Sequence, residues 1–300
     1  MEANLEKKNS TNTSIEKKTK KIKRKKSIQS GDVLKFVIFV FIAVIVIMPM
    51  LVTFFASFKT LSQIGSESAL KPPTSLMLDN YKNVFKNGQV FVALKNSAIL
   101  VIVTVIVNSL LSTMVAYCLT RFDFKLKKVY YAMFLIGLII PGTVTEISRF
   151  GIMTDLKLYN TLLAPIFIYI GADLMQIYIY NQFLEQIPLS IDESAMIDGA
   201  SYFTIYWKII FPMVIPATAT LGILKAVDVL NDMYIPFLYM PGVEHRTLST
   251  LLFNYVQNPQ TSSMPKLSAA TIVVMIPTVV IYFIFQKYIF SGVAAGAVKE

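Results

Sequence analysis

The sequence SIDESAMIDGASYFTIYWKIIFP, from Ser190 to Pro212, sets a short acidic segment between two long apolar runs. Pro188 is expected to end the preceding element, and Ser190 followed three residues later by Glu193 has the pattern of a capping box that starts a helix. Further along, Gly199 can adopt the left-handed backbone conformation that closes a helix. We therefore expect a helix of about two turns, a hinge at Gly199 and a second helix that enters the next apolar run. A helix that short is not stable alone, so it must dock on the rest of the chain or on a partner.

The composition indicates that lipid surrounds most of this chain. Of its 300 residues, 55% are hydrophobic and only 15% are charged, whereas soluble domains carry about a quarter charged residues. A helix needs roughly 20 apolar residues to cross a bilayer. Six segments meet this requirement: Val33–Phe58, Asn96–Leu119, Val129–Phe150, Leu162–Phe183, Ile209–Met240 and Leu267–Phe290. The expected fold is an all-α polytopic membrane protein with six transmembrane helices, contained in residues 33–290.

Basic residues predict the orientation of these helices. Ten of the 28 lysines and arginines lie between Lys7 and Lys26, in a stretch without apolar periodicity, so residues 1–32 are expected to form a disordered tail beside anionic lipid rather than to bind nucleic acid. The segment RFDFKLKK, between the second and third apolar runs, is also basic. Under the positive-inside rule both termini are cytoplasmic, as are the loop at residues 185–208 and the C-terminal tail at residues 291–300.

Polar residues inside the apolar runs are candidates for a solute path. The fifth run contains Lys225, Asp228, Asn231 and Asp232, and ionisable groups at that depth usually face a bundle interior or a wet cavity. The alternative is a Lys225–Asp228 pair that neutralises itself on one helix face. Two further carboxylates, Asp173 and Glu146, are weaker cases of the same kind, and five tyrosines are expected mostly at the membrane interface: Tyr169, Tyr178, Tyr180, Tyr234 and Tyr239.

Several functional classes are excluded by what the sequence lacks. Cys118 and His245 are the only residues of their types, so neither a disulfide nor a metal site built on cysteine or histidine is expected. The sequence has no Gly-rich phosphate loop and no hydrolase or zinc-protease motif. We expect no cofactor in this chain and no enzymatic activity, so any uphill transport must draw its energy from a partner.

The opening stretch resembles a known motif. ESAMIDGA followed by IIFP is similar in residues and spacing to the EAA motif of ABC importer permeases, with Ser194 and Phe211 as mild departures. The resemblance implies a type I ABC importer permease fold in which this loop is the coupling helix, seated in a cleft of a dimeric cytoplasmic ATPase that binds ATP and Mg. It assigns ATPase coupling to Glu193, Ser194, Ala195, Asp198, Gly199, Ile209 and Pro212.

The resemblance extends along nearly the whole chain and favours the carbohydrate importers. PMLVTFFASFKT, NYKNVF, IPLSIDESAMIDGAS and the terminal SGVAAGAVKE look like the second, maltose-permease G-type subunit of these importers. By this likeness Gly296, Ala297, Val298 and Lys299 contact the ATPase, although Glu300 stands where a glycine is usual. The alternative for these residues is a frayed, solvated terminus.

The sequence therefore predicts the permease subunit of an ATP-driven, binding-protein-dependent sugar or oligosaccharide importer of a bacterial cell membrane. Its implied partners are a second homologous permease that completes the translocation path, the ATPase dimer and an extracellular sugar-binding lipoprotein. The main alternative is a secondary transporter or channel that works without ATP, and this needs neither the acidic loop nor the C-terminal tail. A membrane-embedded enzyme would need clustered histidines or carboxylates, for which the sequence offers one histidine.

Overall fold

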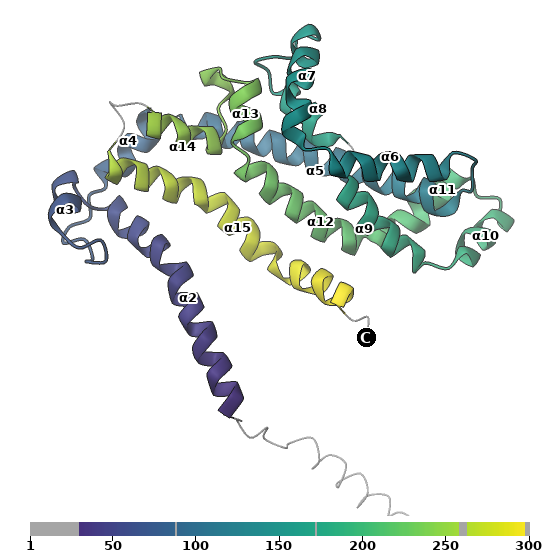
Figure 1. Ribbon diagram of the computed structural model, residues 1–300, viewed down its shortest axis with the longest axis horizontal. Coiled ribbons are helices and arrows are strands. Elements are labelled where there is room, and N and C mark those ends of the chain that lie inside the picture. Colours follow the sequence, from purple (N-terminus) through teal and green to yellow (C-terminus); the bar gives the residue numbers. More distant parts are fainter. Residues whose placement is uncertain (1–29, 88, 172, 258–262, 298–300) are drawn as a thin grey trace, which may run out of the picture. The chain divides into compact units, whose positions relative to one another are not determined.

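The computed structural model (Figure 1) describes residues 30–87, 89–171, 173–257 and 263–297, so most of the predicted N-terminal tail lies outside it. Every regular element in these ranges is helical. In chain order they are α2 (Ser30–Ser57), α3 (Leu61–Ser66), α4 (Asp79–Asn87), α5 (Val90–Arg121), α6 (Lys127–Ile139), α7 (Gly142–Asp155), α8 (Leu163–Ile170), α9 (Leu174–Glu185), α10 (Leu189–Ile197), α11 (Tyr202–Ile205), the π-helix η2 (Tyr206–Ile210), α12 (Phe211–Asn231), α13 (Tyr234–Tyr239), the 3₁₀ turn η3 (Val243–His245), α14 (Leu248–Gln257) and α15 (Met264–Ala297). The expected helical class is confirmed for the described residues.

These ranges contain four to six candidate membrane spans. Four helical stretches are long and apolar enough to cross a bilayer: Val33–Ser57, Val90–Arg121, Tyr202–Asn231 and Met264–Lys287. Two bent pairs add up to two more, α6 with α7 at 101° and α8 with α9 at 41°. Pro141 explains the first break, because it has no N–H to continue α6 and holds the preceding Ile140 in an extended conformation.

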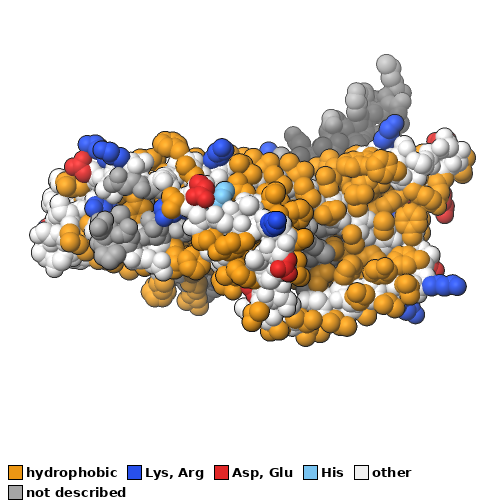
Figure 2. Space-filling view, turned by 90° about the horizontal axis from the view of Figure 1, so that it is seen from above, with side chains coloured by type: hydrophobic (Ala, Val, Ile, Leu, Met, Phe, Trp, Pro, Cys, Tyr) orange, Lys and Arg blue, Asp and Glu red, His pale blue; other side chains and the backbone are white. Residues whose placement is uncertain are grey.

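The chain divides into two compact units, residues 1–52 and residues 53–300. The first contains most of α2, whose apolar side chains from Val33 to Leu51 are exposed, as a lipid-facing helix requires. Hydrophobic side chains also dominate the face shown in Figure 2, where charged ones are sparse. An apolar exterior of this kind matches the prediction of lipid as the surrounding solvent.

Helix α5 is the structural centre of the second unit. It packs most extensively against α12 and α9, and the side that it buries is rich in small and polar residues: Asn96, Ser97, Thr104, Asn108, Ser109, Ser112 and Thr113. Small residues let helix backbones approach closely, and polar ones bond across the interface. Thr113, for example, shares a 2.8 Å hydrogen bond with the hydroxyl of Tyr206 in η2.

The tyrosines do not follow the expectation of an interfacial belt. Tyr180 and Tyr239 are fully buried and Tyr169 is nearly so, whereas Tyr178 and Tyr234 are exposed. Buried hydroxyls usually find a partner, and two of these do: the Tyr239 hydroxyl donates to Glu146 at 2.5 Å and the Tyr169 hydroxyl donates to Asp232 at 2.9 Å. Three of the five tyrosines therefore belong to helix packing, so for them the prediction was wrong.

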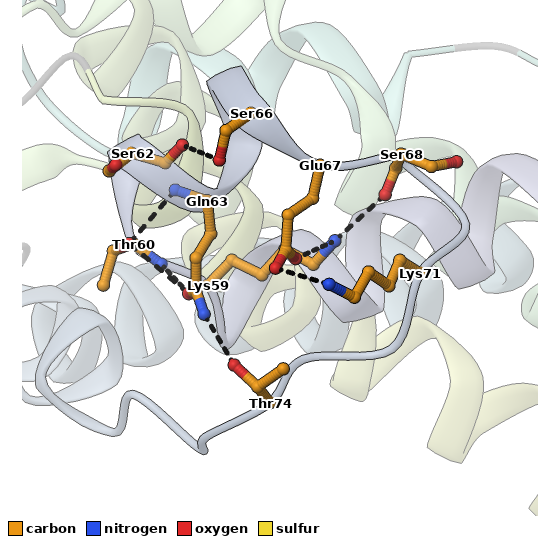
Figure 3. Close-up of polar contacts among 9 residues, drawn as sticks. All are labelled: Lys59, Thr60, Ser62, Gln63, Ser66, Glu67, Ser68, Lys71 and Thr74. Carbon is orange, nitrogen blue, oxygen red and sulfur yellow. Dashed lines mark hydrogen bonds and ion pairs between the residues drawn. The ribbon is translucent and has the colours of Figure 1, made fainter.

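The two ends of the second unit carry different short helices. Helices α10 and α11 lie at one end, and α3, α4 and α14 lie at the other (Figure 1). In the α3 segment, Thr60 accepts a hydrogen bond from the Gln63 N–H at 3.2 Å, and the Gln63 side chain accepts one from the Thr60 N–H at 2.9 Å (Figure 3). Buried Lys59 lies beside Glu67, which also pairs with Lys71. This segment closes on itself through its own side chains.

Candidate functional site

Helix α10 begins differently from the sequence prediction. Its N-cap is Pro188, which makes no side-chain capping bond, and Ser190 lies inside the first turn. The Ser190 carbonyl accepts a hydrogen bond from the Ser194 hydroxyl at 2.8 Å, so the predicted capping box of Ser190 and Glu193 is wrong. Proline starts this helix because its missing N–H would be unsatisfied there in any case.

The predicted closure of α10 at Gly199 is confirmed. Gly199 has φ +83°, the Ala200 N–H donates to the Ala195 carbonyl at 2.9 Å, and the Gly199 N–H donates to the Met196 carbonyl at 3.0 Å. This is the Schellman arrangement, which requires a left-handed residue directly after the cap. Any L side chain at position 199 would be strained by the backbone conformation even though the space around its Cβ is open.

An ion pair fixes α10 to the far end of α5. Arg121 Nε lies 3.2 Å from Asp192 Oδ2, and their side chains are only 5% and 6% exposed. The guanidinium also donates to the Ile187 carbonyl at 2.9 Å, and the Tyr117 hydroxyl lies 3.4 Å from Asp192 Oδ1. Because the partners are buried, separating them would leave an uncompensated charge, so α10 is held firmly to a membrane-spanning helix.

The other side of α10 is exposed. Glu193, Ser194 and Asp198 are exposed, and Ile197 is 87% exposed. Ala195 faces inward instead and is buried in the cluster of α5, α9 and η2. The small residue of the motif therefore packs against the chain, while its polar residues and one large apolar side chain are available to a partner.

The second half of the motif forms the entry to α12. Ser201 caps α11 by accepting from the Thr204 N–H at 3.3 Å. The chain then makes the π-turn η2, which includes half-buried Ile209, immediately before exposed Pro212. In a regular helix the proline ring would clash with the carbonyl four residues earlier, and the wider π-turn falls at that position.

Lys225, a candidate path residue, forms an ion pair with a residue on another helix, which the sequence did not predict. Lys225 Nζ lies 3.0 Å from Asp173 Oδ2, whereas no ion pair joins it to Asp228 among the described residues. The proposed self-neutralised pair within α12 is therefore wrong. Asp173 also caps α9 through its other oxygen, which accepts from the Gln176 N–H at 3.2 Å, so the pair joins the start of α9 to the middle of α12.

The remaining candidates of the fifth run are separated by the end of α12. Asp228 and Asn231 are exposed. Asp232 ends α12 and begins α13, because its Oδ1 accepts from the Tyr234 N–H at 2.7 Å and its Oδ2 accepts from the Tyr169 hydroxyl at 2.9 Å. The predicted span Ile209–Met240 is thus divided at Asp232. Of the four candidates, Lys225 lines a cavity of about 570 Å³ between α7, α8, α9 and α12.

Two residues that matter most in this geometry were not assigned a role from sequence. Arg121 counted only toward membrane orientation, as part of the basic segment RFDFKLKK, and Asp192 was given no site role. Their pairing could not be read from spacing, because it joins helices far apart in the chain. Of the C-terminal candidates, Gly296 and Ala297 end α15, while Val298 and Lys299 lie outside the described residues. The part of the chain that is described holds no cluster of three metal-binding side chains.

Known proteins resemble this chain over most of its length. The profile of the family described as "Binding-protein-dependent transport system inner membrane component" matches residues 27–294. A putative ABC transporter permease of Caldicellulosiruptor sp. strain Rt8B.4 is 33% identical over 265 residues, which are 87% of this chain and 96% of the relative. The probable starch degradation products permease AmyC of Thermoanaerobacterium thermosulfurigenes is 33% identical over 261 residues, 85% of this chain and 92% of the relative.

A solved structure has the same fold. One chain of a bacterial ABC transporter involved in the import of the acidic polysaccharide alginate superposes with a TM-score of 0.78 at 20% identity, covering 88% of this chain and 98% of that chain. The likeness thus spans nearly the full length of both molecules.

Proposed function

The chain belongs to the family of binding-protein-dependent transport system inner membrane components, and from this premise we propose that it is the permease subunit of an ATP-driven oligosaccharide importer. The relative AmyC is described as a permease for starch degradation products, which favours a saccharide as the solute. The observation that carries the proposal is α10: a short helix exposed on one side and fixed to a membrane span on the other by Arg121 and Asp192.

An exposed helix with a rigid anchor is suited to transmit force. In the proposal, a dimeric ATPase binds ATP and Mg and holds the exposed side of α10, where Glu193, Ser194, Asp198 and Ile197 lie. Movement of α10 is passed to α5 through the buried ion pair and to α12 through Gly199 and the turn before Pro212. The terminal residues Gly296 to Lys299 make a second contact with the ATPase.

The proposed setting is a bacterial cell membrane, with both termini and α10 in the cytoplasm. The four to six candidate spans and the basic segment between α5 and α6 support this orientation. A second, homologous permease completes the solute path, and an extracellular lipoprotein delivers the sugar. The Lys225 side of α12 contributes this chain's part of the path.

Purification from the native membrane tests the assembly. Mild detergent extraction followed by mass spectrometry should recover an ATPase, a second permease and a sugar-binding lipoprotein together with this chain. Recovery of this chain alone, with ATP-independent solute movement in liposomes, would establish the alternative of a secondary transporter or channel.

A variant on the exposed side of α10 localises the ATPase contact. Ile197→Glu puts a charge at a side chain that is 87% exposed in the single chain, and it should remove the ATPase from the purified complex while the second permease stays. Leu61→Glu, at a 62% exposed position of α3, is the matched control and should leave the ATPase bound. If both variants retain the ATPase, α10 is not its docking helix.

A further inference from the structure

A polar cavity lies beside the break between α8 and α9. It has a volume of about 570 Å³, and its lining includes Arg149, Phe167, Tyr169, Asp173 and Lys225. This volume falls within the range of small-molecule sites, roughly 300 to 1,000 Å³. The lining combines charged hydrogen-bonding groups with aromatic rings.

The broken helix explains why the cavity can be wet. Non-helical backbone at membrane depth is tolerated only where protein or cavity water satisfies it. Buried Asn108 of α5 donates to the Tyr169 carbonyl at 3.3 Å and to the Gly171 carbonyl at 3.0 Å, and Asp173 accepts from the Gln176 N–H on the other side of the break. The break is therefore held in place by dedicated polar side chains, and discontinuous helices of this kind surround the substrate in many transporters.

The Lys225–Asp173 pair differs from a purely structural ion pair in its exposure. Its side chains are 15% and 24% exposed, whereas those of Arg121 and Asp192 are 5% and 6% exposed. An ammonium group has three N–H donors, and Asp173 occupies one of them. Lys225 can therefore donate to a solute in the cavity without giving up its partner.

The three charged side chains that line the cavity each have an oppositely charged partner, and Asp228 interacts electrostatically with Lys225 from outside the lining. Lys225 pairs with Asp173, and Arg149 lies 3.1 Å from Glu146. Paired charges favour a neutral solute with many hydroxyl groups over an anion or a cation, because each pair offers both donors and an acceptor. Phe167, which is 52% exposed, adds an apolar ring for the C–H face of such a solute.

We propose that this cavity is a saccharide subsite contributed by this subunit, in which Lys225 and Arg149 donate to sugar hydroxyls, Asp173 accepts from them and Phe167 packs on the ring. The inference rests on the proposed function. It adds that side chains of this subunit bind the transported sugar directly.

Thiol labelling tests the site in the complete transporter reconstituted with its partners in vesicles. In a Cys118→Ala background, Met175→Cys puts a thiol in the cavity lining, and Tyr178→Cys puts one on the same helix outside that lining; both native side chains are 60% exposed. Radiolabelled maltotriose, raffinose and arabinotriose are the probes, and the one that wild-type vesicles accumulate with ATP is used. That sugar should slow labelling at position 175 about tenfold or more, because bound sugar covers the thiol and must break its contacts with the cavity before the thiol can react. Labelling at position 178 should not change.

A transport ratio provides the second measurement. Lys225→Met should lower the number of sugar molecules imported per ATP hydrolysed about tenfold, the loss expected for one charge-assisted hydrogen bond, and Lys225→Arg should restore most of it. Equal labelling at position 175 with and without sugar, or a wild-type ratio for Lys225→Met, overturns the subsite while leaving the importer intact. Failure of wild-type vesicles to accumulate any of the three sugars overturns the proposed function itself.

Discussion

The two ends of the second unit hold a short helix in place in different ways. Each carries a short helix between membrane runs, and each has a buried cation beside a carboxylate: Lys59 with Glu67 at 3.6 Å near α3, and Arg121 with Asp192 at 3.2 Å near α10. Near α3 all the partners are close in sequence (Figure 3). Near α10 the cation comes from a different helix, the end of α5.

This difference separates a self-contained loop from a connected one. Most side-chain bonds of the α3 segment are local, although the segment also packs against α15 and accepts hydrogen bonds from Asn80. The α10 helix has no side-chain cap of its own and depends on α5 for its position, so the two must move together. A helix that passes force from a partner to a membrane span needs the second arrangement, and the following predictions test the contrast in order of decreasing effect.

Removal of the buried cation should have the largest effect. Arg121→Met leaves Asp192 buried and unpaired, which costs about 3 to 5 kcal/mol and should markedly lower the thermal unfolding temperature of the detergent-purified complex. Lys59→Met is the matched control, because Glu67 keeps its pair with Lys71 at 2.9 Å, and its loss should be clearly smaller. The double variant Arg121→Met with Asp192→Leu should recover part of the stability, and a double variant no better than the single one would contradict the ion pair as the anchor.

A side chain at the hinge should have the next largest effect. Gly199→Val forces a β-branched residue to φ +83°, which costs about 1 to 2 kcal/mol, and should lower the sugar imported per ATP hydrolysed. Gly65 in α3 is the comparison, because space around it is equally open and its backbone is helical. Gly65→Val should therefore leave this ratio unchanged, and unchanged import by Gly199→Val would remove the hinge from the coupling route.

Capping bonds give the third contrast. Thr60→Ala removes half of a complete capping box and should cost about 1 kcal/mol, seen as faster hydrogen exchange of the α3 amides. Ser190→Ala, at the position where the sequence predicts a box that the structure lacks, should leave exchange in α10 unchanged. Faster exchange of the α10 amides in Ser190→Ala than in the wild type would show that the Ser190 hydroxyl caps the helix.

The sequence was informative wherever a feature is local or depends on composition. Apolar length predicted the helical membrane class, and Gly199 predicted the end of α10, because both follow from a residue and its neighbours. The sequence was silent on Arg121–Asp192, and the alternative of a Lys225–Asp228 pair named the wrong partner for Lys225, since Asp173 lies on another helix. Pairs that form between helices depend on how the bundle packs, and a single sequence does not contain this information. The prediction of a capping box at Ser190 was wrong because Pro188 is also a valid start for the helix, and the structure uses that start.

The pH dependence of the α3 segment is the smallest expected effect. The hydrogen bond from Lys71, together with the nearby charges of Lys71 and Lys59, lowers the pKa of Glu67. A carboxyl with a lowered pKa stabilises the folded segment fully above its unfolded pKa of about 4.3, and this contribution is lost as the pH falls through the lower folded value. Protection factors of the α3 amides, corrected for intrinsic exchange, should therefore be constant above the unfolded pKa of about 4.3 and should decline as the pH falls below it. Glu67→Gln should start from lower protection and show no such decline, because it has no proton to gain. A flat wild-type profile over this range, or an identical decline in Glu67→Gln, would mean that the ionised Glu67 side chain does not stabilise the α3 segment.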